Sequence, residues 1–167
     1  MNQVIYYSEY SSPLGQIILS TTEQGLCGIY FHDQRYFSGT QQWQKAAHPH
    51  LEQAIKQLDE YFQGQRQTFD LQLDLSVSGT AFQRAVWNEL LSIPFGQISS
   101  YQMQANRIHK PRAVRAVGGA IGRNPISIVI PCHRVLSSDR ALTGYAGGLE
   151  RKKYLLELEG TRVTVVA

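Results

Sequence analysis

The chain has 167 residues, a net charge of +3 and 43% hydrophobic residues, so it can hold one domain or two small ones with a sizeable core. No apolar run approaches the ~18 residues of a membrane span, and the N-terminus lacks the basic start and apolar core of a signal peptide. With only Cys27 and Cys132 present, a disulfide framework and a cysteine-rich zinc site are excluded, and we expect a cytoplasmic protein with free thiols.

The charge is distributed unevenly along the chain. Residues 1–79 hold four basic and eight acidic side chains, whereas residues 80–167 hold twelve basic and five acidic ones. No acid occurs between Glu89 and Asp139, although this stretch contains six basic residues: Arg107, Lys110, Arg112, Arg115, Arg123 and Arg134. This asymmetry favours a polyanion as the partner of the second half, although a basic surface without a partner has the same pattern.

The first 78 residues predict a small α/β domain with a short antiparallel sheet. Apolar and alternating runs indicate four strands, at residues 4–10, 16–20, 26–31 and 68–77. Ser12-Pro13-Leu14-Gly15 is a turn between the first two strands, and residues 32–47 have the polar, weakly periodic sequence of a loop. Apolar residues at helical spacing from His50 to Phe62 predict a helix that Gly64 ends.

This first domain contains no recognisable catalytic group. Cys27 lies within an apolar strand, which favours a core residue over a ligand. His32, His48 and His50 have no partner at metal-ligand spacing and are expected at the surface. We therefore predict a structural role for residues 1–78 and no metal site.

Residues 79–167 predict a mostly helical domain with a helix-turn-helix. Thr80 and Gln83 form a capping box, so a helix with the apolar face Phe82, Ala85, Val86 and Leu90 begins there and ends before Pro94. Ser99 or Ser100 caps a short helix that runs to Ile108. Pro111 suits the first turn of a further helix over residues 112–121. Two short helices joined by a tight turn commonly bind DNA.

The second helix of this pair consists almost entirely of small or basic residues. Arg112 and Arg115 alternate with alanine and valine, and Gly118-Gly119 follow. Small side chains allow a helix backbone to pack closely against a neighbouring helix. They equally allow it to approach a nucleic-acid groove, especially a narrow minor groove, into which Arg112 or Arg115 could project. The sequence leaves both interpretations open.

Cys132 follows an apolar run, Ile126–Ile130, and a proline, and His133 and Arg134 follow it directly. A thiol at the end of a buried segment beside two groups that can be cationic indicates a stabilised thiolate and covalent chemistry. Thr143–Gly148 is rich in glycine and is either a surface loop or a lid that can approach a flat ligand. Residues 149–159 predict a helix that Gly160 ends.

Taken together, these segments resemble the O6-alkylguanine-DNA alkyltransferases, the methylated-DNA–protein-cysteine methyltransferases. The resemblance covers nearly all of residues 79–165, and Ser12–Gly15 adds a weaker match in the first domain. The matching elements, in chain order, are Gly79–Gln83 with Trp87, Ile93–Gly96, Ser100-Tyr101, Ala113–Gly118, Asn124-Pro125, Pro131–Val135, Gly144–Gly148 and Glu159-Gly160.

The resemblance implies a single, irreversible transfer of the alkyl group from O6-alkylguanine, and also O4-alkylthymine, to Cys132. His133 acts through a water as the base, and Glu159 orients it. Asn124 holds the turn that presents Cys132, and Tyr101 donates a proton or a hydrogen bond to the leaving guanine. The reaction needs no metal or organic cofactor, because the alkyl group is already activated on the base.

The resemblance also implies that the protein flips the damaged base out of double-stranded DNA through the minor groove. Arg115 then fills the gap in the duplex, and the flipped base is read by the carbonyls of Cys132 and Val135 and the amide of Ala146. The remaining expected contacts are Tyr101, Arg112, Ala113, Ala116, Gly118 and Arg123 for DNA, and Tyr101 and Tyr145 for the base. A single-use protein needs no second copy, so we expect a monomer, associated with the nucleoid if the source is prokaryotic.

Four positions depart from the family pattern: Gln104, His109, Arg112 and Ser127. Gln104 replaces a common leucine, and His109 and Arg112 replace common glycines of the turn. Two other functions fit part of the sequence: a non-catalytic binder of alkylated DNA, in which the motif cysteine is replaced, and a cysteine hydrolase using Cys132, His133 and Glu159. Cys132 argues against the first, and the second leaves the arginine-rich helix and Asn124 without a role.

Overall fold

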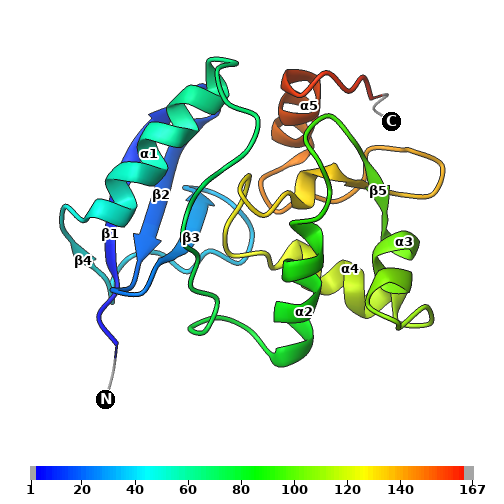
Figure 1. The fold of residues 1–167 in the computed structure, drawn as a ribbon, viewed down its shortest axis with the longest axis horizontal. Helices are drawn as coiled ribbons and strands as arrows, with labels where there is room; N and C mark the ends of the chain where they lie inside the picture. The colour runs from blue at the N-terminus through cyan, green and yellow to red at the C-terminus, as the bar shows by residue number, and fades with distance from the viewer. Residues whose placement is uncertain (1–2, 164–167) are drawn as a thin grey trace. The chain divides into compact units, whose positions relative to one another are not determined.

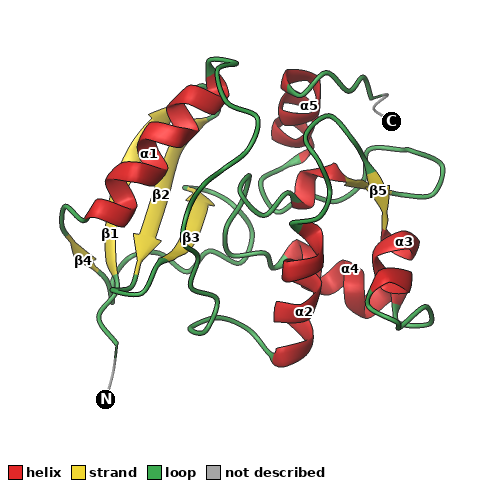
Figure 2. Cartoon of the chain, viewed as in Figure 1, coloured by secondary structure: helices red, strands yellow, loops and turns green. Residues whose placement is uncertain are grey.

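Residue contacts divide the chain into two units, Met1–Ser78 and Gly79–Ala167. The computed structural model describes residues 3–163, and Figures 1 and 2 show a sheet with one helix in the first unit and a mainly helical second unit. The α+β fold class is therefore confirmed. Among residues 3–163, no helix has the length and apolar character that crossing a membrane requires.

The first unit is a four-stranded sheet covered by one helix. The strands are β1 (Tyr6–Ser12), β2 (Gly15–Thr21), β3 (Leu26–Phe31) and β4 (Gln44–Lys45), in the order β3-β2-β1-β4. The predicted β1–β2 hairpin and β3 are confirmed as antiparallel. The sheet is not purely antiparallel, because β4 pairs parallel with β1 inside the stretch predicted to be loop. Figure 1 shows α1 (Pro49–Phe62) lying along the sheet.

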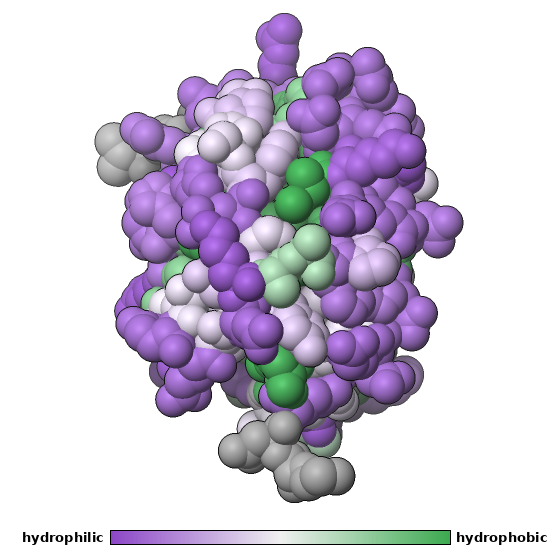
Figure 3. All heavy atoms as spheres, turned by 90° about the vertical axis from the view of Figure 1, so that its left-hand side faces the viewer, coloured by the Kyte–Doolittle hydropathy of each residue, from purple (hydrophilic) through white to green (hydrophobic). Residues whose placement is uncertain are grey.

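Leu51, Ala54, Leu58, Tyr61 and Phe62 of α1 form the buried side of that helix, as their helical spacing predicts. They pack against a sheet whose buried residues include Ile17, Leu19, Ile29 and Cys27. In contrast to this apolar core, the outer surface on the α1 and β4 side is mostly hydrophilic, with a few separate apolar areas (Figure 3). The first unit thus has its own core, with Cys27 inside it.

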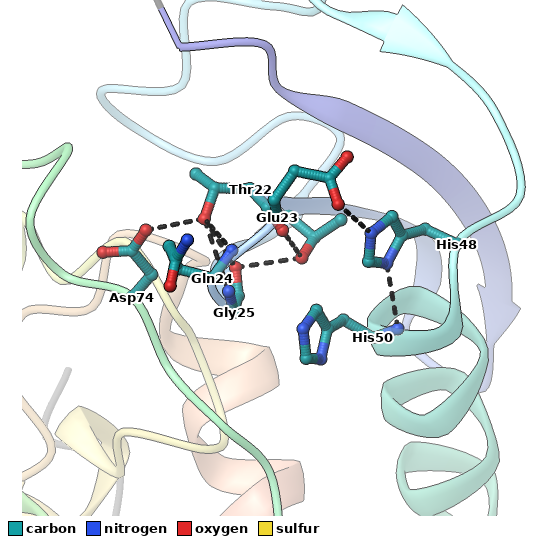
Figure 4. Close-up of polar contacts among 8 residues, drawn as sticks. Thr22, Glu23, Gln24, Gly25, His48, His50 and Asp74 are labelled. Carbon is teal, nitrogen blue, oxygen red and sulfur yellow. Dashed lines mark hydrogen bonds and ion pairs between the residues drawn. The ribbon is translucent and has the colours of Figure 1, made fainter.

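His48 caps the N-terminus of α1. Its ring nitrogen Nδ1 accepts a hydrogen bond from the His50 amide at 3.1 Å, and Nε2 lies 3.5 Å from Glu23 Oε2 (Figure 4). The His48 and His50 rings stack with centroids 5.1 Å apart. Within the described part of the chain, no group of three or more His, Cys, Asp or Glu side chains is arranged to hold a metal ion.

The strand predicted at residues 68–77 is wrong. Only an isolated bridge forms there, between Leu73 and Leu26. The amide and carbonyl of Asp70 bond instead to the side chain of Gln57, at 2.9 and 3.0 Å. The buried Asp74 carboxylate accepts from Thr22 Oγ1 at 2.6 Å and from the Ser76 amide at 3.0 Å (Figure 4 shows the Thr22 contact). Side chains therefore bond to the Asp70 amide and carbonyl and to the Ser76 amide, which a neighbouring strand would otherwise pair.

The second unit contains four α-helices, a single 3₁₀ turn and two short paired strands among its described residues. They are α2 (Ala81–Leu90), β5 (Ser99–Ser100), α3 (Tyr101–Arg107), α4 (Val114–Gly122), η1 (Cys132–Arg134), β6 (Val135–Leu136) and α5 (Leu149–Leu158). The capping box of Thr80 and Gln83 is confirmed. The predicted face of α2 is partly wrong, because Ala85 is exposed and Trp87 is buried instead. Trp87 Nε1 donates to the Ala120 carbonyl at 2.7 Å and so joins α2 to α4.

The helix-turn-helix consists of α3 and α4, and Ser100 caps α3 by accepting from the Met103 amide. The second helix begins at Val114, two residues later than predicted, so Pro111 and Arg112 belong to the turn. His109 adopts a positive φ of 61° in this turn. This backbone conformation is unfavourable for most residues, and glycine and short polar residues adopt it most readily. The pair is confirmed, with a longer turn than the sequence suggests.

Gln104 is buried in α3, and this position predicts a stabilising double substitution. Its Nε2 donates to Ser99 Oγ at 2.8 Å, but its Oε1 is buried with no hydrogen-bond partner among the described residues. Replacing both partners by apolar groups removes that cost. We expect Ser99→Ala/Gln104→Leu to raise the free energy of unfolding by about 1 kcal/mol, measured by urea denaturation. Ser99→Ala alone should lower it, because Nε2 also loses its acceptor, and a double variant less stable than wild type would contradict this account.

Candidate active site

The apolar run before Cys132 folds into tight turns that one side chain, Asn124, holds together. Asn124 Oδ1 accepts from the Ile126 amide at 2.9 Å, and Nδ2 donates to the Ile130 carbonyl at 2.7 Å and to Cys132 Sγ at 3.1 Å. Between these contacts Ile128 adopts a φ of +74°, which is strained for a β-branched residue by about 1–3 kcal/mol. The buried turn keeps this conformation, and it places the thiol against Asn124.

Cys132 is buried, with 7% of its surface exposed. Burial raises the pKa of its thiol, while the hydrogen bond from Asn124 and the positive charge of Lys152 act in the opposite direction and do not overcome it. At neutral pH the resting group is therefore a thiol and needs a base before it can react. The expectation that His133 and Arg134 stabilise a thiolate by standing beside it is wrong, because both side chains bond to Glu159.

Glu159 ends α5 and receives hydrogen bonds from both of these neighbours of Cys132. His133 Nε2 lies 2.8 Å from Glu159 Oε2, while Arg134 Nε and Nη2 donate to Oε1 and Oε2 at 2.7 and 3.0 Å. Burial acts to raise the pKa of Glu159, but the hydrogen bonds from His133 and Arg134 outweigh it and hold the pKa at about 2. Glu159 is therefore a carboxylate throughout the physiological range.

His133 is completely buried and stays neutral at pH 7. Burial lowers its pKa most strongly, Glu159 acts to raise it, and the charges of Arg134 and Lys152 lower it further. Because the Glu159 carboxylate can only accept a hydrogen bond from Nε2, the proton of the neutral ring lies on that nitrogen. Nδ1 is then a proton acceptor, and it has no hydrogen-bond partner among the described residues.

Lys152 is a buried cation that our sequence reasoning missed. Its side chain has 0% exposure, and Nζ donates to the carbonyls of Val135, Thr143 and Gly144 at 2.7, 2.6 and 3.0 Å. Burial lowers the pKa of Lys152 to about 8, and Cys132 acts to raise it, so Lys152 is mostly charged at neutral pH. One signal was available: Lys152 precedes Leu155 and Leu156 by three and four positions, which places it on the apolar face of α5.

The predicted base-contacting residues lie in or next to the segments whose carbonyls accept hydrogen bonds from Lys152. Val135 is buried in β6, whereas Tyr145 and Ala146 are half-buried in the glycine-rich loop. Burial raises the pKa of Tyr145 well above its usual value, and Cys132 adds to this effect. Tyr101, the first residue of α3, donates its hydroxyl to the Thr143 carbonyl at 3.4 Å. Tyr101 and Lys152 thus both donate to the Thr143 carbonyl of the loop.

The predicted DNA-contacting residues lie on and beside α4. Arg112, Arg115, Ala116 and Arg123 are exposed, and Ala113 and Gly118 are half-buried. A Cβ added at Gly119 would meet no atom within 4 Å among the described residues, and one at Gly118 would make ordinary contact, at 3.7 Å, with the Tyr101 ring. Close packing inside the second unit therefore does not require glycine at either position.

The second unit combines a helix-turn-helix that has exposed arginines with a buried cysteine next to a His–Glu pair. This combination indicates a class of nucleic-acid-binding proteins with a reactive cysteine. Comparison with family models agrees. Residues 81–161 match the 6-O-methylguanine DNA methyltransferase, DNA binding domain, and residues 5–75 match the ribonuclease-like domain of the same family. The chain belongs to the 6-O-methylguanine DNA methyltransferase family.

Individual relatives match along nearly their whole length. The methylated-DNA–protein-cysteine methyltransferase of Haemophilus influenzae is 42% identical over 93% of this chain and 86% of its own length. The Methanosarcina barkeri protein of the same name is 44% identical over 93% and 97%. The crystal structure of Mycobacterium tuberculosis OGT in complex with DNA is 41% identical, covers 95% of this chain and 94% of its own, and has a TM-score of 0.85.

Proposed function

We propose that this protein repairs DNA by moving the alkyl group of O6-alkylguanine, and also of O4-alkylthymine, onto Cys132. The Cys132 thiolate attacks the alkyl carbon, a sulfur–carbon bond forms, and the carbon–oxygen bond to the base breaks. The electron pair of that bond goes to the base, which takes up a proton. The thioether is stable, so each molecule reacts once and Cys132 is consumed.

The observation that carries this proposal is the hydrogen-bonded arrangement around Cys132. A thiol with a raised pKa needs a base, and His133 offers an unprotonated, buried Nδ1 next to it in the chain. We assign His133 as the base that removes the thiol proton through a water, with Glu159 as its orienting group. Asn124 donates to Sγ at 3.1 Å and stabilises the anion that forms.

We propose that α4 holds double-stranded DNA from the minor groove. Packing inside the unit does not require glycine at Gly118 or Gly119, and Ala116 and Gly119 are exposed, which favours approach to a ligand over approach to a neighbouring helix. Arg112, Arg115 and Arg123 supply positive charge that attracts phosphates without sequence preference. The lesion can then be bound wherever it occurs.

The damaged base must leave the stack, because a buried thiol cannot reach an alkyl carbon inside a duplex. We assign to Arg115 the role of filling the gap that the flipped base leaves in the duplex. The flipped base lies against Tyr101, Val135, Tyr145 and Ala146, with backbone groups of Cys132, Val135 and Ala146 reading its edge. Tyr101, whose hydroxyl makes a long contact of 3.4 Å to the Thr143 carbonyl, exchanges that acceptor for the leaving base.

Residues 79–167 thus carry both DNA binding and alkyl transfer, and residues 1–78 have a structural role. One chain holds every group that the reaction uses, so the protein acts as a monomer. No cofactor is consumed. The protein acts where the DNA is located, which in a prokaryote is the nucleoid within the cytoplasm.

The direct test is incubation with a duplex that contains one O6-methylguanine, followed by mass spectrometry of the digested protein. We expect one added methyl mass on the peptide that contains Cys132, in a one-to-one ratio with lesions removed and with no second turnover. An unmodified Cys132 peptide after the lesion has disappeared would refute the proposal.

Arg115→Ala should separate base flipping from chemistry. Because its assigned role exists only in the duplex, we expect transfer from duplex O6-methylguanine to slow by about 10- to 100-fold, in line with a few kcal/mol for extrusion. Transfer from free O6-benzylguanine should change less than about twofold. The measurement is the single-turnover rate constant on each substrate, with exposed Arg140→Ala as the matched loss of charge. Equal losses on both substrates would contradict this role.

A further inference from the structure

The side chain of Arg134 is not accounted for by the reaction proposed above. The family resemblance assigns the activating roles to His133 and Glu159 and none to Arg134. Yet the Arg134 side chain is only 7% exposed, and a buried guanidinium is costly unless each of its donors finds a partner. Its contacts therefore need an explanation.

Those contacts join three separate segments of the second unit. From η1, Arg134 Nε and Nη2 form a side-on pair with both oxygens of Glu159 at the end of α5. Nη1 donates to the carbonyl of Ile93 at 2.6 Å, in the turn after α2. The guanidinium carbon lies 5.9 Å from the centre of the Phe95 ring in the same turn. This geometry fixes the carboxylate plane of Glu159 as well as its position.

Glu159 Oε2 is shared between Arg134 and the His133 ring. A carboxylate that bonded only to His133 would be free to rotate, and its full negative charge would act on the imidazole. With Arg134 bound side-on, the carboxylate is fixed, and part of its charge is balanced by the guanidinium. His133 then keeps its Nε2 proton and stays neutral, with Nδ1 ready to accept.

We propose that Arg134 is a positioning residue of the alkyl-transfer site: it locks Glu159 in the orientation and ionisation state that keep His133 a neutral base directed at the Cys132 proton. This inference rests on the proposed function. It extends that function from a His–Glu pair to a buried His–Glu–Arg group in which the arginine acts only through Glu159.

The electrostatic surroundings of His133 agree with this role. The charged and titratable groups around it are Arg134 and Cys132 of η1 and Glu159 and Lys152 of α5. Tyr145 of the loop belongs to the same surroundings, because Cys132 and Glu159 both act on its hydroxyl. The charge of Arg134 lowers the pKa of His133, whereas Glu159 raises it. Removing the guanidinium must therefore raise the pKa of His133.

The test is a pH titration of the His133 imidazole by ¹⁵N NMR in wild type, Arg134→Met, Arg134→Lys and the exposed control Arg140→Met. His133→Gln identifies the signal among the five histidines. We expect Arg134→Met to shift the His133 titration to higher pH. In Arg134→Lys the His133 titration should stay near that of wild type, because lysine keeps the positive charge, although it loses the bidentate hydrogen bonds. In Arg140→Met the titration should match wild type. A His133 titration in Arg134→Met that coincides with wild type would overturn the proposal.

Rates supply the second measurement. We expect transfer from O6-benzylguanine to fall about 10- to 100-fold in Arg134→Met, the loss seen when a residue that orients a metal-binding side chain is removed, and less in Arg134→Lys. If Arg134→Met does not fold, the double-mutant cycle of Arg134→Lys with Glu159→Gln tests the proposal instead. Arg134→Lys should slow transfer when Glu159 is present, but should have little effect in the Glu159→Gln background, where residue 159 is neutral. An equal loss in both backgrounds would overturn the proposal. The imidazole titration needs no alkyl donor, so its result is independent of whether the protein transfers alkyl groups.

Discussion

Cys132→Ala should abolish alkyl transfer while leaving the protein folded and able to bind DNA. No other described side chain in the second unit is a thiol, and loss of the nucleophile lowers the rate by more than about 10⁴-fold in a serine protease. The turn should survive, because Asn124 keeps its bonds to the Ile126 amide and the Ile130 carbonyl. The measurement is methyl transfer from duplex O6-methylguanine over long incubation, with DNA affinity measured in parallel.

Cys27→Ala is the matched control for this experiment. Cys27 is also a buried thiol whose pKa is raised by burial, but it lies in β3 of the first unit, and its Sγ lies 3.4 Å from Ser20 Oγ. We expect normal transfer, with one methyl group on Cys132. Transfer retained in Cys132→Ala, or lost in Cys27→Ala, would point to a different acceptor.

Glu159→Gln should weaken both the fold and the reaction. The substitution removes the anion that pairs with the buried Arg134, and breaking such a pair costs about 3–5 kcal/mol in other proteins because a buried charge is left unbalanced. His133 also loses the carboxylate that fixes its tautomer, so we expect transfer to slow by about 10²- to 10⁴-fold. Urea denaturation measures the first effect and single-turnover kinetics with O6-benzylguanine the second.

The pH dependence of stability provides an independent check on Glu159. Its pKa falls from a usual 4.5 to about 2 in the folded protein, so the carboxylate stabilises the fold above pH 4.5, and that contribution is lost as the pH falls towards 2. The shift corresponds to about 3 kcal/mol. Wild type should therefore lose its stability advantage over Glu159→Gln between about pH 5 and pH 2. A constant difference across that range would show that another group is responsible.

Glu157→Gln is the control on the same helix. Glu157 pairs with Lys153 at 3.8 Å, and about half of each side chain is exposed, so its loss should change stability by less than about 1 kcal/mol. Its transfer rate should equal that of wild type. A defect as large as that of Glu159→Gln would mean that any loss of acidity on α5 has the same effect.

The second unit shows how far local patterns extend. The capping box of Thr80, the cap at Ser100 and the end of α5 before Gly160 were all predictable, because these signals depend on residues three or four positions apart. The start of α4 was predicted too early. Pro111 suits the first turn of a helix, but the chain first makes a turn through His109 with positive φ, which the sequence did not indicate.

The first unit shows where local patterns fail. Residues 68–77 alternate like a strand, but alternation reports only which side chains can be buried, and Asp74 is buried as well. The backbone there pairs with the Gln57 side chain across 13 positions. The two-residue strand β4 is too short to have any periodicity, and it exists because β1 offers it a partner.

For the candidate site, the residues of the Cys132 segment, the basic and small character of α4, and the family could all be predicted from the sequence, since they lie in contiguous motifs. Which charged groups contact one another became known only from the folded arrangement. His133 and Arg134 stand beside Cys132 in the chain but bond to Glu159, which lies 26 and 25 positions away. Lys152, 20 positions after Cys132, supplies the buried positive charge that acts on the thiol. Electrostatic energy depends on distance and burial in the folded protein, and neither can be read from adjacency along the chain.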